Sequence, residues 1–212
     1  KESSAASDVY KRQVLGCGQF CTNPGLVVGI RSPHFEHFLQ TLVARMADQG
    51  PQTMLNAGTL RSYQNAVQHL LAHPGIQHLA GQPQTGNQAQ PQLFKADVSL
   101  LLNGDPLLQE EVFGPCTVVV EVADAQQLAE ALRHLQGQLT ATLIAEPDDL
   151  HAFASLVPLL ERKAGRLLLN GYPTGVEVSD AMVHGGPYPA TSDARGTCLL
   201  YTSDAADDSL RV

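Results

Sequence analysis

The chain has 212 residues, of which 43% are hydrophobic and 16% charged, so it can bury a core of one domain, or one and a part. Acidic residues outnumber Lys and Arg by 21 to 13, giving a formal net charge of -8. That balance excludes the basic surface typical of nucleic-acid binding and of binding to anionic membranes. No run is apolar enough to span a bilayer, and the 4 cysteines do not form a disulfide framework, so a cytoplasmic protein is expected.

The chain begins with a segment that is not expected to pack. Residues 1–13 are small and polar and show no sustained hydrophobic period, which predicts a disordered end. Residues 196–212 have the same character. The two ends also resemble translated adapter sequence, SSAASDVYKRQ in front and CLLYTSDAADD behind. On this interpretation the ends are non-native, and the native protein occupies about residues 14–195.

A glycine-rich segment with two cysteines follows, GCGQFCTNPGLVVGI at residues 16–30. Asn23-Pro24-Gly25 predicts a type II turn, because proline fixes the second position and glycine accepts a positive φ at the third. Gly16 and Gly18 let the backbone come close to another strand or to a ligand.

Cys21 therefore lies beside a tight turn, near the start of an apolar strand. A thiol there can be partly exposed, with backbone N–H groups free to meet a developing oxyanion. A small buried cysteine is the alternative interpretation. Cys17 and Cys21 do not have C-x-x-C spacing, and no second cluster completes a metal or redox site.

Two helices are expected next. Ser32 can cap a helix with Pro33 at its first position, and apolar residues then recur at helical spacing as far as Met46. A second helix is predicted over residues 60–71, before a His-Pro-Gly breaker. Residues 81–92 are rich in Gln, Pro, Gly and Asn and are interpreted as an exposed connection.

The second half of the chain alternates strands and helices. Strands are predicted at residues 117–122, 139–145 and 166–169. Between them, Asp124 and Gln127 have capping-box spacing for one helix, and Asp148 begins another that reaches about Arg162. This order predicts an α/β fold with parallel strands and right-handed crossovers.

Three segments, in order, resemble the aldehyde dehydrogenase superfamily. GQFCTNPG at 18–25 looks like its active-site cysteine segment, specifically that of the branch that oxidises 2,5-dioxopentanoate (α-ketoglutaric semialdehyde). EEVFGP at 110–115 is similar to the EE-[IV]-F-G-P motif, and NGYPTGVEVSDAMVHGGPYPATSD at 170–193 to the C-terminal signature of that branch. The resemblance covers residues 14–195 and implies an incomplete catalytic domain with a mostly parallel sheet flanked by helices.

The resemblance also implies roles for individual residues. Cys21 matches the nucleophile, whose thiolate attacks the aldehyde carbon and whose backbone N–H stabilises the oxyanion. Glu111 matches the glutamate that binds the nicotinamide-side ribose, and Phe113 the ring that packs near the nicotinamide of NAD or NADP. No metal ligand is expected. Candidate substrate-pocket residues are Phe20, Thr22, Asn170, His184 and Gly185.

The expected partners follow from the same resemblance: a small aldehyde substrate, no nucleic acid, no membrane, and a full-length protein that is a homo-oligomer. The superfamily's general-base glutamate, cofactor-contacting lysine and oxyanion asparagine precede the nucleophile and have no counterpart in this chain. Cys17 stands where a small residue such as alanine is usual. We therefore predict that the isolated chain lacks dehydrogenase activity.

Two other functions stay open at this point. One is a cofactor-independent cysteine hydrolase or acyltransferase, which would require His184 beside the Cys21 thiol. The superfamily deacylates with a glutamate, so His184 is not assigned as a base. The other is a truncated α/β domain without catalysis, with an apolar face that the complete protein would bury.

Overall fold

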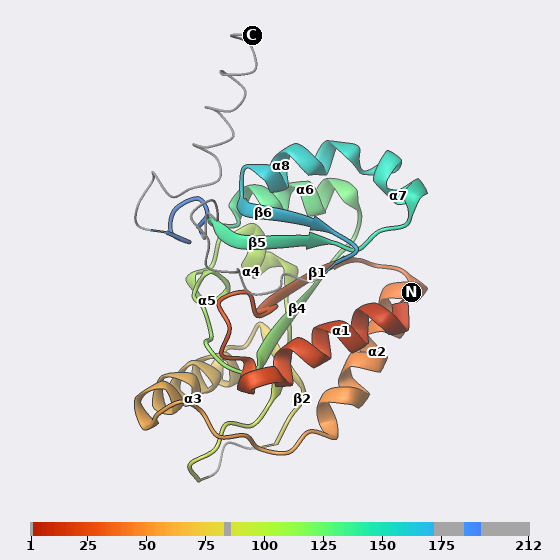
Figure 1. Ribbon diagram of the computed structural model, residues 1–212. Helices are drawn as coiled ribbons and strands as arrows, with labels where there is room; N and C mark the ends of the chain where they lie inside the picture. Colours follow the sequence, from red (N-terminus) through yellow and green to blue (C-terminus); the bar gives the residue numbers. More distant parts are fainter. Residues whose placement is uncertain (1, 83–85, 172–184, 192–212) are drawn as a thin grey trace. The chain divides into compact units, whose positions relative to one another are not determined.

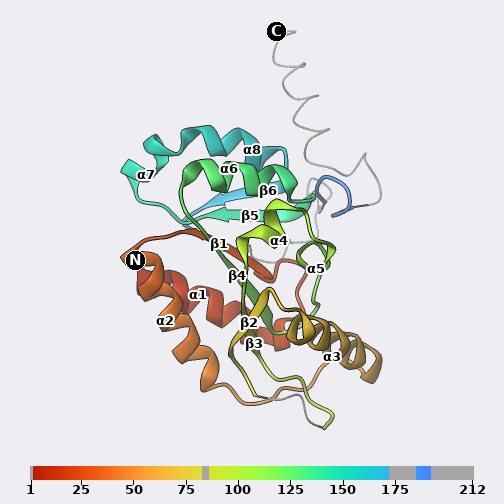
Figure 2. The same cartoon turned by 180° about the vertical axis from the view of Figure 1, so that it is seen from behind.

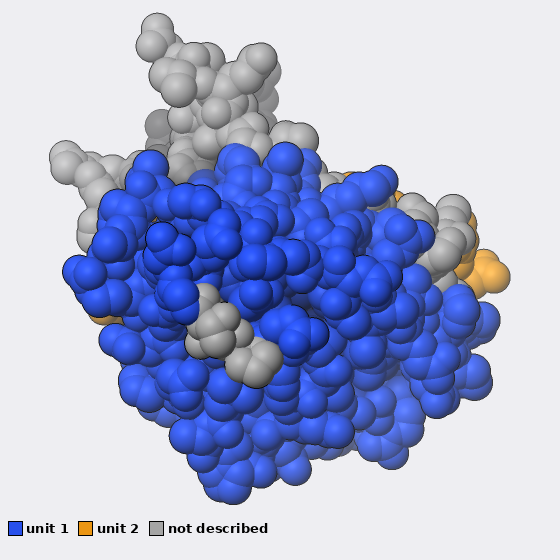
Figure 3. Space-filling view, turned by 90° about the horizontal axis from the view of Figure 1, so that it is seen from below, with its two compact units in different colours: residues 1–131 blue, residues 132–212 orange. Residues whose placement is uncertain are grey.

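The computed structural model describes residues 2–82, 86–171 and 185–191. The chain divides into two compact units, residues 1–131 and 132–212, coloured blue and orange in Figure 3. No helix within the described ranges is long and apolar enough to cross a membrane. The predicted end 196–212, His184 and most of the 170–193 signature lie outside the described residues.

The first unit contains a four-stranded sheet in the order β1-β4-β3-β2, all four of which are labelled in Figure 2. β1 (Leu26–Ile30) and β3 (Gln92–Ala96) both pair in parallel with β4 (Cys116–Val122). β2 (Ile76–Ala80) adds to β3 in the antiparallel direction. The predicted α/β class with a mostly parallel sheet is therefore confirmed.

β4 is central because its sequence is apolar on both faces. Residues 117–120 are buried, as expected of a continuous β-branched run in a parallel sheet covered on both sides. Val118 lies opposite Leu26 of β1 and Phe94 of β3. The Val118 N–H donates to the carbonyl of Gly25 at 2.9 Å. The residues just before β1 are therefore held beside the residues that lead into β4.

The two predicted helices of this unit are present. α2 (Pro33–Ala47) begins as expected: the Ser32 hydroxyl accepts from the Phe35 N–H at 3.1 Å, and Pro33 stands in the first turn. α3 (Ala57–Ala72) starts earlier than the predicted 60–71, because the side chain of Asn56 caps it.

The start of the chain differs from the sequence expectation. Residues 2–14 form α1 (Glu2–Val14), which lies beside α2 in Figures 1 and 2. Its small residues allow this close packing, so Ala5, Ala6 and Val9 are buried in the core with residues of α2 and of β2, β3 and β4. The expected disorder is therefore wrong for these residues.

The segment between β2 and β4 also departs from the prediction. Residues 81–92 do not form an exposed connection throughout: the part from residue 89 to 92 is buried and leads into β3. Two short helices follow, α4 (Val98–Leu102) and α5 (Pro106–Gln109), capped by Asp97 and Asp105. Helices this short carry too few turns for a hydrophobic period, so the pattern did not indicate them.

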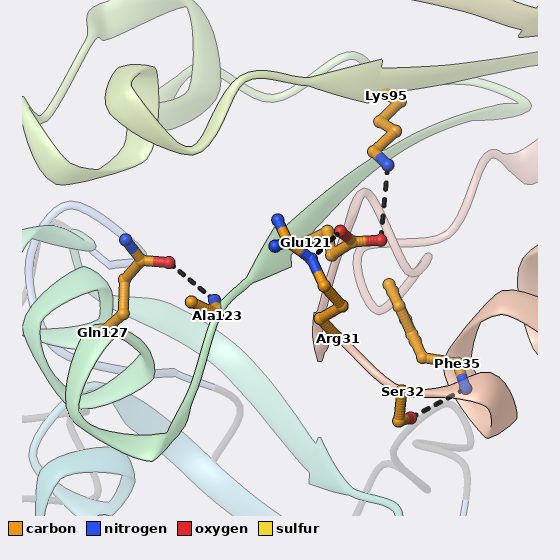
Figure 4. A network of polar contacts seen from close by, with 7 residues as sticks. All are labelled: Arg31, Ser32, Phe35, Lys95, Glu121, Ala123 and Gln127. Atoms are coloured by element: carbon orange, nitrogen blue, oxygen red, sulfur yellow. Dashed lines mark hydrogen bonds and ion pairs between the residues drawn. The ribbon is translucent and has the colours of Figure 1, made fainter.

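Charged side chains of neighbouring strands in this sheet form a network of hydrogen bonds and ion pairs (Figure 4). Glu121 of β4 accepts from the Arg31 Nε at 2.7 Å and from the Lys95 Nζ of β3 at 3.3 Å. The hydrogen bond from Arg31, with the nearby Lys95 charge, holds the pKa of Glu121 below its usual value. Figure 4 also shows Gln127, whose side chain accepts from the Ala123 N–H at 2.7 Å near the start of α6 (Ala125–His134).

The second unit contains a two-stranded parallel sheet, β5 (Gln138–Leu143) with β6 (Ala164–Leu169). This pair confirms the predicted parallel crossover. β4 pairs with β1 and β3 instead of joining β5, so the three predicted strands do not form one sheet. The sequence order gave no information about which strands become neighbours.

The single helix predicted from Asp148 to Arg162 is broken. It consists of α7 (Pro147–Ala152), the 3-10 turn η2 (Ala154–Leu156) and α8 (Val157–Glu161). Pro158 stands in the first turn of α8. Proline has no N–H for the preceding turn and its ring crowds that turn, so the helix restarts here instead of continuing.

Candidate active site

Cys21 lies on the surface, in a turn that connects η1 (Leu15–Gly18) to β1. The Asn23 N–H donates to the Phe20 carbonyl at 3.0 Å, so Cys21 and Thr22 are the two central residues of that turn. Within the described residues, the Cys21 N–H has no hydrogen-bond acceptor. An exposed thiol whose own N–H is unused is the arrangement that attack on a carbonyl requires.

The turn is not the one predicted from Asn23-Pro24-Gly25. Gly25 is not among the residues with a positive φ, which a type II turn would require at its third position. The Gly25 N–H instead donates to the Asn23 carbonyl at 2.8 Å, forming a three-residue turn with Pro24 at its centre. Proline's fixed φ suits both turns, so the sequence pattern did not distinguish them.

The residues before Cys21 have an uncommon backbone. Gly16, Cys17 and Gly18 have φ of 56, 58 and 63°, in the left-handed region. A Cβ added to Gly18 would lie 2.6 Å from the carbonyl carbon and oxygen of Gly114. The prediction that Gly18 allows a close backbone approach is thus confirmed, and the partner is the EEVFGP segment.

Side-chain amides on both sides of Cys21 attach the turn to other segments. Asn23 donates from Nδ2 to the Gly114 carbonyl at 2.9 Å and to the Gln13 side chain at 3.3 Å. Gln19 donates to the Gly16 carbonyl at 3.0 Å and accepts from the Leu55 N–H at 2.8 Å.

A buried polar group extends this attachment beneath the turn. The Thr117 hydroxyl donates to the Pro24 carbonyl at 3.0 Å. The Gln13 amide donates to the carbonyls of Pro24 and Cys116 and to the Thr117 hydroxyl. Gln13 and Thr117 are fully buried, so these bonds satisfy carbonyls that would otherwise lose hydration.

The EEVFGP segment is placed next to the cysteine turn through Gly114. Gly114 has a φ of 150°, and a Cβ on it would overlap the ring of Tyr63, so glycine is required. The Tyr63 hydroxyl donates to the carbonyls of Gln90 and Pro115, at 2.6 and 3.2 Å. The two motifs are thus adjacent in this unit, although Asn23 and Gly114, which join them, are 91 positions apart in the sequence.

The two candidate cofactor residues both reach the surface. Glu111 is exposed as a residue, yet neighbouring protein atoms partly desolvate its carboxyl, and this raises its pKa. Phe113 exposes 38% of its surface, an unusual fraction for a large apolar side chain. On one segment, the exposed Glu111 carboxylate can bind two vicinal hydroxyls of a ligand, and the exposed Phe113 ring can pack against a planar ring of the same ligand.

The substrate-pocket candidates have different surroundings. The Phe20 ring packs over Gly16 and remains 39% exposed, whereas Thr22 is buried. In the second unit, Asn170 ends β6 with a φ of 49°, and its amide bonds both the N–H and the carbonyl of Ala145, at 3.0 and 2.8 Å. Gly185 is buried against the backbone of Gly165. Asn170 and Gly185 therefore have local structural contacts of their own.

The remaining polar groups do not assemble a second site. Among the described residues, no three His, Cys, Asp or Glu side chains are placed to hold a metal ion. Burial raises the pKa of the Cys17 thiol to about 11 and that of Cys116 to about 12, so both are inert beside Cys21. An open depression of about 400 Å³ lined by His69, His73 and Glu110 contains none of the predicted site residues.

Sequence reasoning missed the residues that hold the site together. Asn23 was interpreted only as a turn former, and Thr117 only as a strand residue. The signal for Thr117 was a polar residue at the start of an otherwise apolar run, since buried hydroxyls almost always bond to a neighbour. Tyr63 and Gln19 had no comparable signal.

Comparisons with known proteins agree with these motifs. The model of the aldehyde dehydrogenase family matches residues 2–187. The chain is 55% identical, over 92% of its length, to alpha-ketoglutaric semialdehyde dehydrogenase of Acinetobacter baylyi. It is 46% identical over 89% of its length to alpha-ketoglutaric semialdehyde dehydrogenase 2 of Azospirillum brasilense. It spans 37% and 36% of the lengths of these two relatives.

Solved structures show the same fold at low sequence identity. Δ-pyrroline-5-carboxylate dehydrogenase from Mycobacterium tuberculosis aligns with a TM-score of 0.73 at 18% identity, covering 94% of this chain and 38% of that one. An NAD-dependent benzaldehyde dehydrogenase from Corynebacterium glutamicum aligns with a TM-score of 0.65 at 19% identity, covering 81% and 37%.

Proposed function

The chain belongs to the aldehyde dehydrogenase family, and from this premise we propose that it carries the nucleophile segment of an enzyme that oxidises 2,5-dioxopentanoate to 2-oxoglutarate. The observation that supports this most is the exposed Cys21 thiol in a turn held against the EEVFGP segment. The substrate follows from the relative that is 55% identical, which is named for this aldehyde.

The residues of this chain account for the first chemical step. The Cys21 sulfur, as thiolate, adds to the aldehyde carbon, and the carbonyl oxygen becomes an oxyanion. The Cys21 N–H, free of acceptors among the described residues, donates to that oxygen. The oxyanion adduct then loses a hydride, its C–O bond becomes a carbonyl double bond, and a thioester is left on Cys21. Water cleaves the thioester, which releases the carboxylate and regenerates the thiol.

A nicotinamide nucleotide, NAD or NADP, supplies the chemistry of accepting the hydride. The residues present fit this group: Glu111 offers an exposed carboxylate to the ribose hydroxyls, and Phe113 an exposed ring face. The related Δ-pyrroline-5-carboxylate dehydrogenase from Mycobacterium tuberculosis has been solved with NAD bound. A homo-oligomeric full-length protein in the cytoplasm stays a prediction.

The test uses a full-length hybrid. Residues 14–187 of this chain would replace the matching part of the Acinetobacter baylyi relative. NAD(P)H formation would be followed by near-ultraviolet absorbance with 2,5-dioxopentanoate and with a simple aliphatic aldehyde. We expect the hybrid to prefer 2,5-dioxopentanoate and the Cys21→Ala hybrid to be inactive. Undiminished turnover by the Cys21→Ala hybrid would refute the nucleophile assignment, and a preference for the aliphatic aldehyde would refute the substrate.

A further inference from the structure

Asn23 is the residue that both closes the Cys21 turn and ties it to the EEVFGP segment. Its backbone N–H donates to the Phe20 carbonyl at 3.0 Å, across Cys21. Its side-chain Nδ2 donates to the Gly114 carbonyl at 2.9 Å. Because a carbonyl can only accept, this contact also fixes which end of the amide is nitrogen. One residue therefore sets both the shape and the position of the turn.

The hydrogen bond from Asn23 to the Gly114 carbonyl should hold the turn more strongly than the bonds of Gln19 do, because it is more buried. The Gln19 bonds on the other side of Cys21 are exposed, so water competes for the same groups. The Asn23 amide is partly buried, and its Oδ1 is buried without a hydrogen-bond partner among the described residues. A buried acceptor left unpaired costs about 1–3 kcal/mol, so the unpaired Oδ1 offsets part of the stabilisation that the two Nδ2 bonds provide.

We propose that Asn23 is a positioning residue for the Cys21 nucleophile. By holding the turn to Gly114, it orients the thiol and the unused N–H of Cys21 toward a common carbonyl group. The same turn is also held by the close approach of Gly18 to the Gly114 backbone and by the hydrogen bond from the Thr117 hydroxyl to the Pro24 carbonyl. This inference rests on the proposed function, because it assigns Asn23 a role in attack on a carbonyl.

Two thiol reactions separate positioning from a general structural role. Acylation of Cys21 by p-nitrophenyl acetate builds an oxyanion that needs the Cys21 N–H, whereas alkylation by iodoacetamide builds none. Loosening the turn exposes the thiol equally to both reagents but moves the N–H away from the oxyanion. Only loss of positioning should lower the ratio of the two rates.

The experiment measures both rates on the 212-residue chain, with the modified cysteine identified by peptide mass spectrometry. The variants are Asn23→Ala and Asn23→Asp; the second keeps the shape of the side chain but loses both donors. Gln127→Ala is the matched control, because it removes a side-chain amide of α6 that accepts from the backbone N–H of Ala123, away from the Cys21 turn. Far-UV circular dichroism verifies that each variant is folded.

We expect the ratio of acylation to alkylation to fall about tenfold or more in whichever Asn23 variant folds, since small misplacements of reacting groups have effects of this order. The control should keep the parent ratio. An unchanged ratio in a folded Asn23 variant would overturn the positioning role and leave the proposed function intact. If Cys21 in the parent chain is acylated no faster than glutathione, the nucleophile assignment and the positioning role both fail.

Discussion

Replacing Gly18 by alanine should separate the cysteine turn from the EEVFGP segment. Two costs add at this position. The φ of 63° is unfavourable for a residue with a Cβ by about 1–2 kcal/mol. The Cβ would also lie 2.6 Å from the Gly114 carbonyl, where backbone atoms have to move. Crowding of this kind costs about 1–3 kcal/mol more.

Comparison with a Gly104→Ala variant isolates the second cost, which is the crowding of the added Cβ. Its φ of 64° matches that of Gly18, and a Cβ on it would meet nothing within 4 Å. Replacing either glycine also reduces the entropy of the unfolded chain, which stabilises by about 0.4–1 kcal/mol. Gly104→Ala should therefore destabilise by about 0–1.6 kcal/mol, and Gly18→Ala by about 1–4.6 kcal/mol.

Urea unfolding followed by far-UV circular dichroism measures the difference directly. Because the chain has two compact units, the midpoints of any separate transitions are compared individually. Gly18→Ala should lower the midpoint of the first unit more than Gly104→Ala does. Equal midpoints for the two variants would refute the close approach of Gly18 to Gly114.

Three further outcomes are expected. Tyr63→Phe should destabilise the first unit by about 0.5–1.5 kcal/mol, measured by urea unfolding, because the Gln90 and Pro115 carbonyls lose one donor while Gln92 still donates to both. The lowered folded-state pKa of Glu121 makes its bonds to Arg31 and Lys95 stabilising at neutral pH. That contribution should be lost as the pH falls through the folded pKa, and Glu121→Gln should reduce the acid dependence of the unfolding free energy. Iodoacetamide should modify Cys21 before Cys17 at pH 8, because Cys17 is buried and, with a pKa of about 11, only about a thousandth of it is thiolate. Equal labelling of these two cysteines in the folded chain would contradict the burial of Cys17.

The sequence predicts the features that depend on short-range patterns. The Ser32 cap, the β-branched strand leading to Val122 and the glycine at position 18 each follow from one residue and its neighbours. These features need no knowledge of what lies across the sheet. The choice of Cys21 is different, because its neighbours left a buried cysteine open and only the resemblance of three ordered segments, the first of which contains it, favoured the nucleophile.

What the sequence does not predict depends on contacts between distant segments. Nothing in the residues of β4 shows that it pairs with β1 and β3 in place of β5. The three-residue turn at Pro24 is followed by a Gly25 carbonyl that accepts from the Val118 N–H, 93 positions away in the sequence. The packing of α1 on α2 likewise uses alanines that show no hydrophobic period.

The left-handed run at Gly16, Cys17 and Gly18 restricts which sequences can stand before the nucleophile. Glycine is free of the steric penalty of this conformation, and asparagine tolerates it better than most residues. Cys17 bears the cost, and its thiol is enclosed beside the Gln52 carbonyl at 3.9 Å. A library randomised at position 17 should therefore be enriched in glycine and asparagine and depleted in valine, isoleucine and threonine. The backbone before the nucleophile therefore limits the choice of residue at position 17 more than the chemistry of its side chain does.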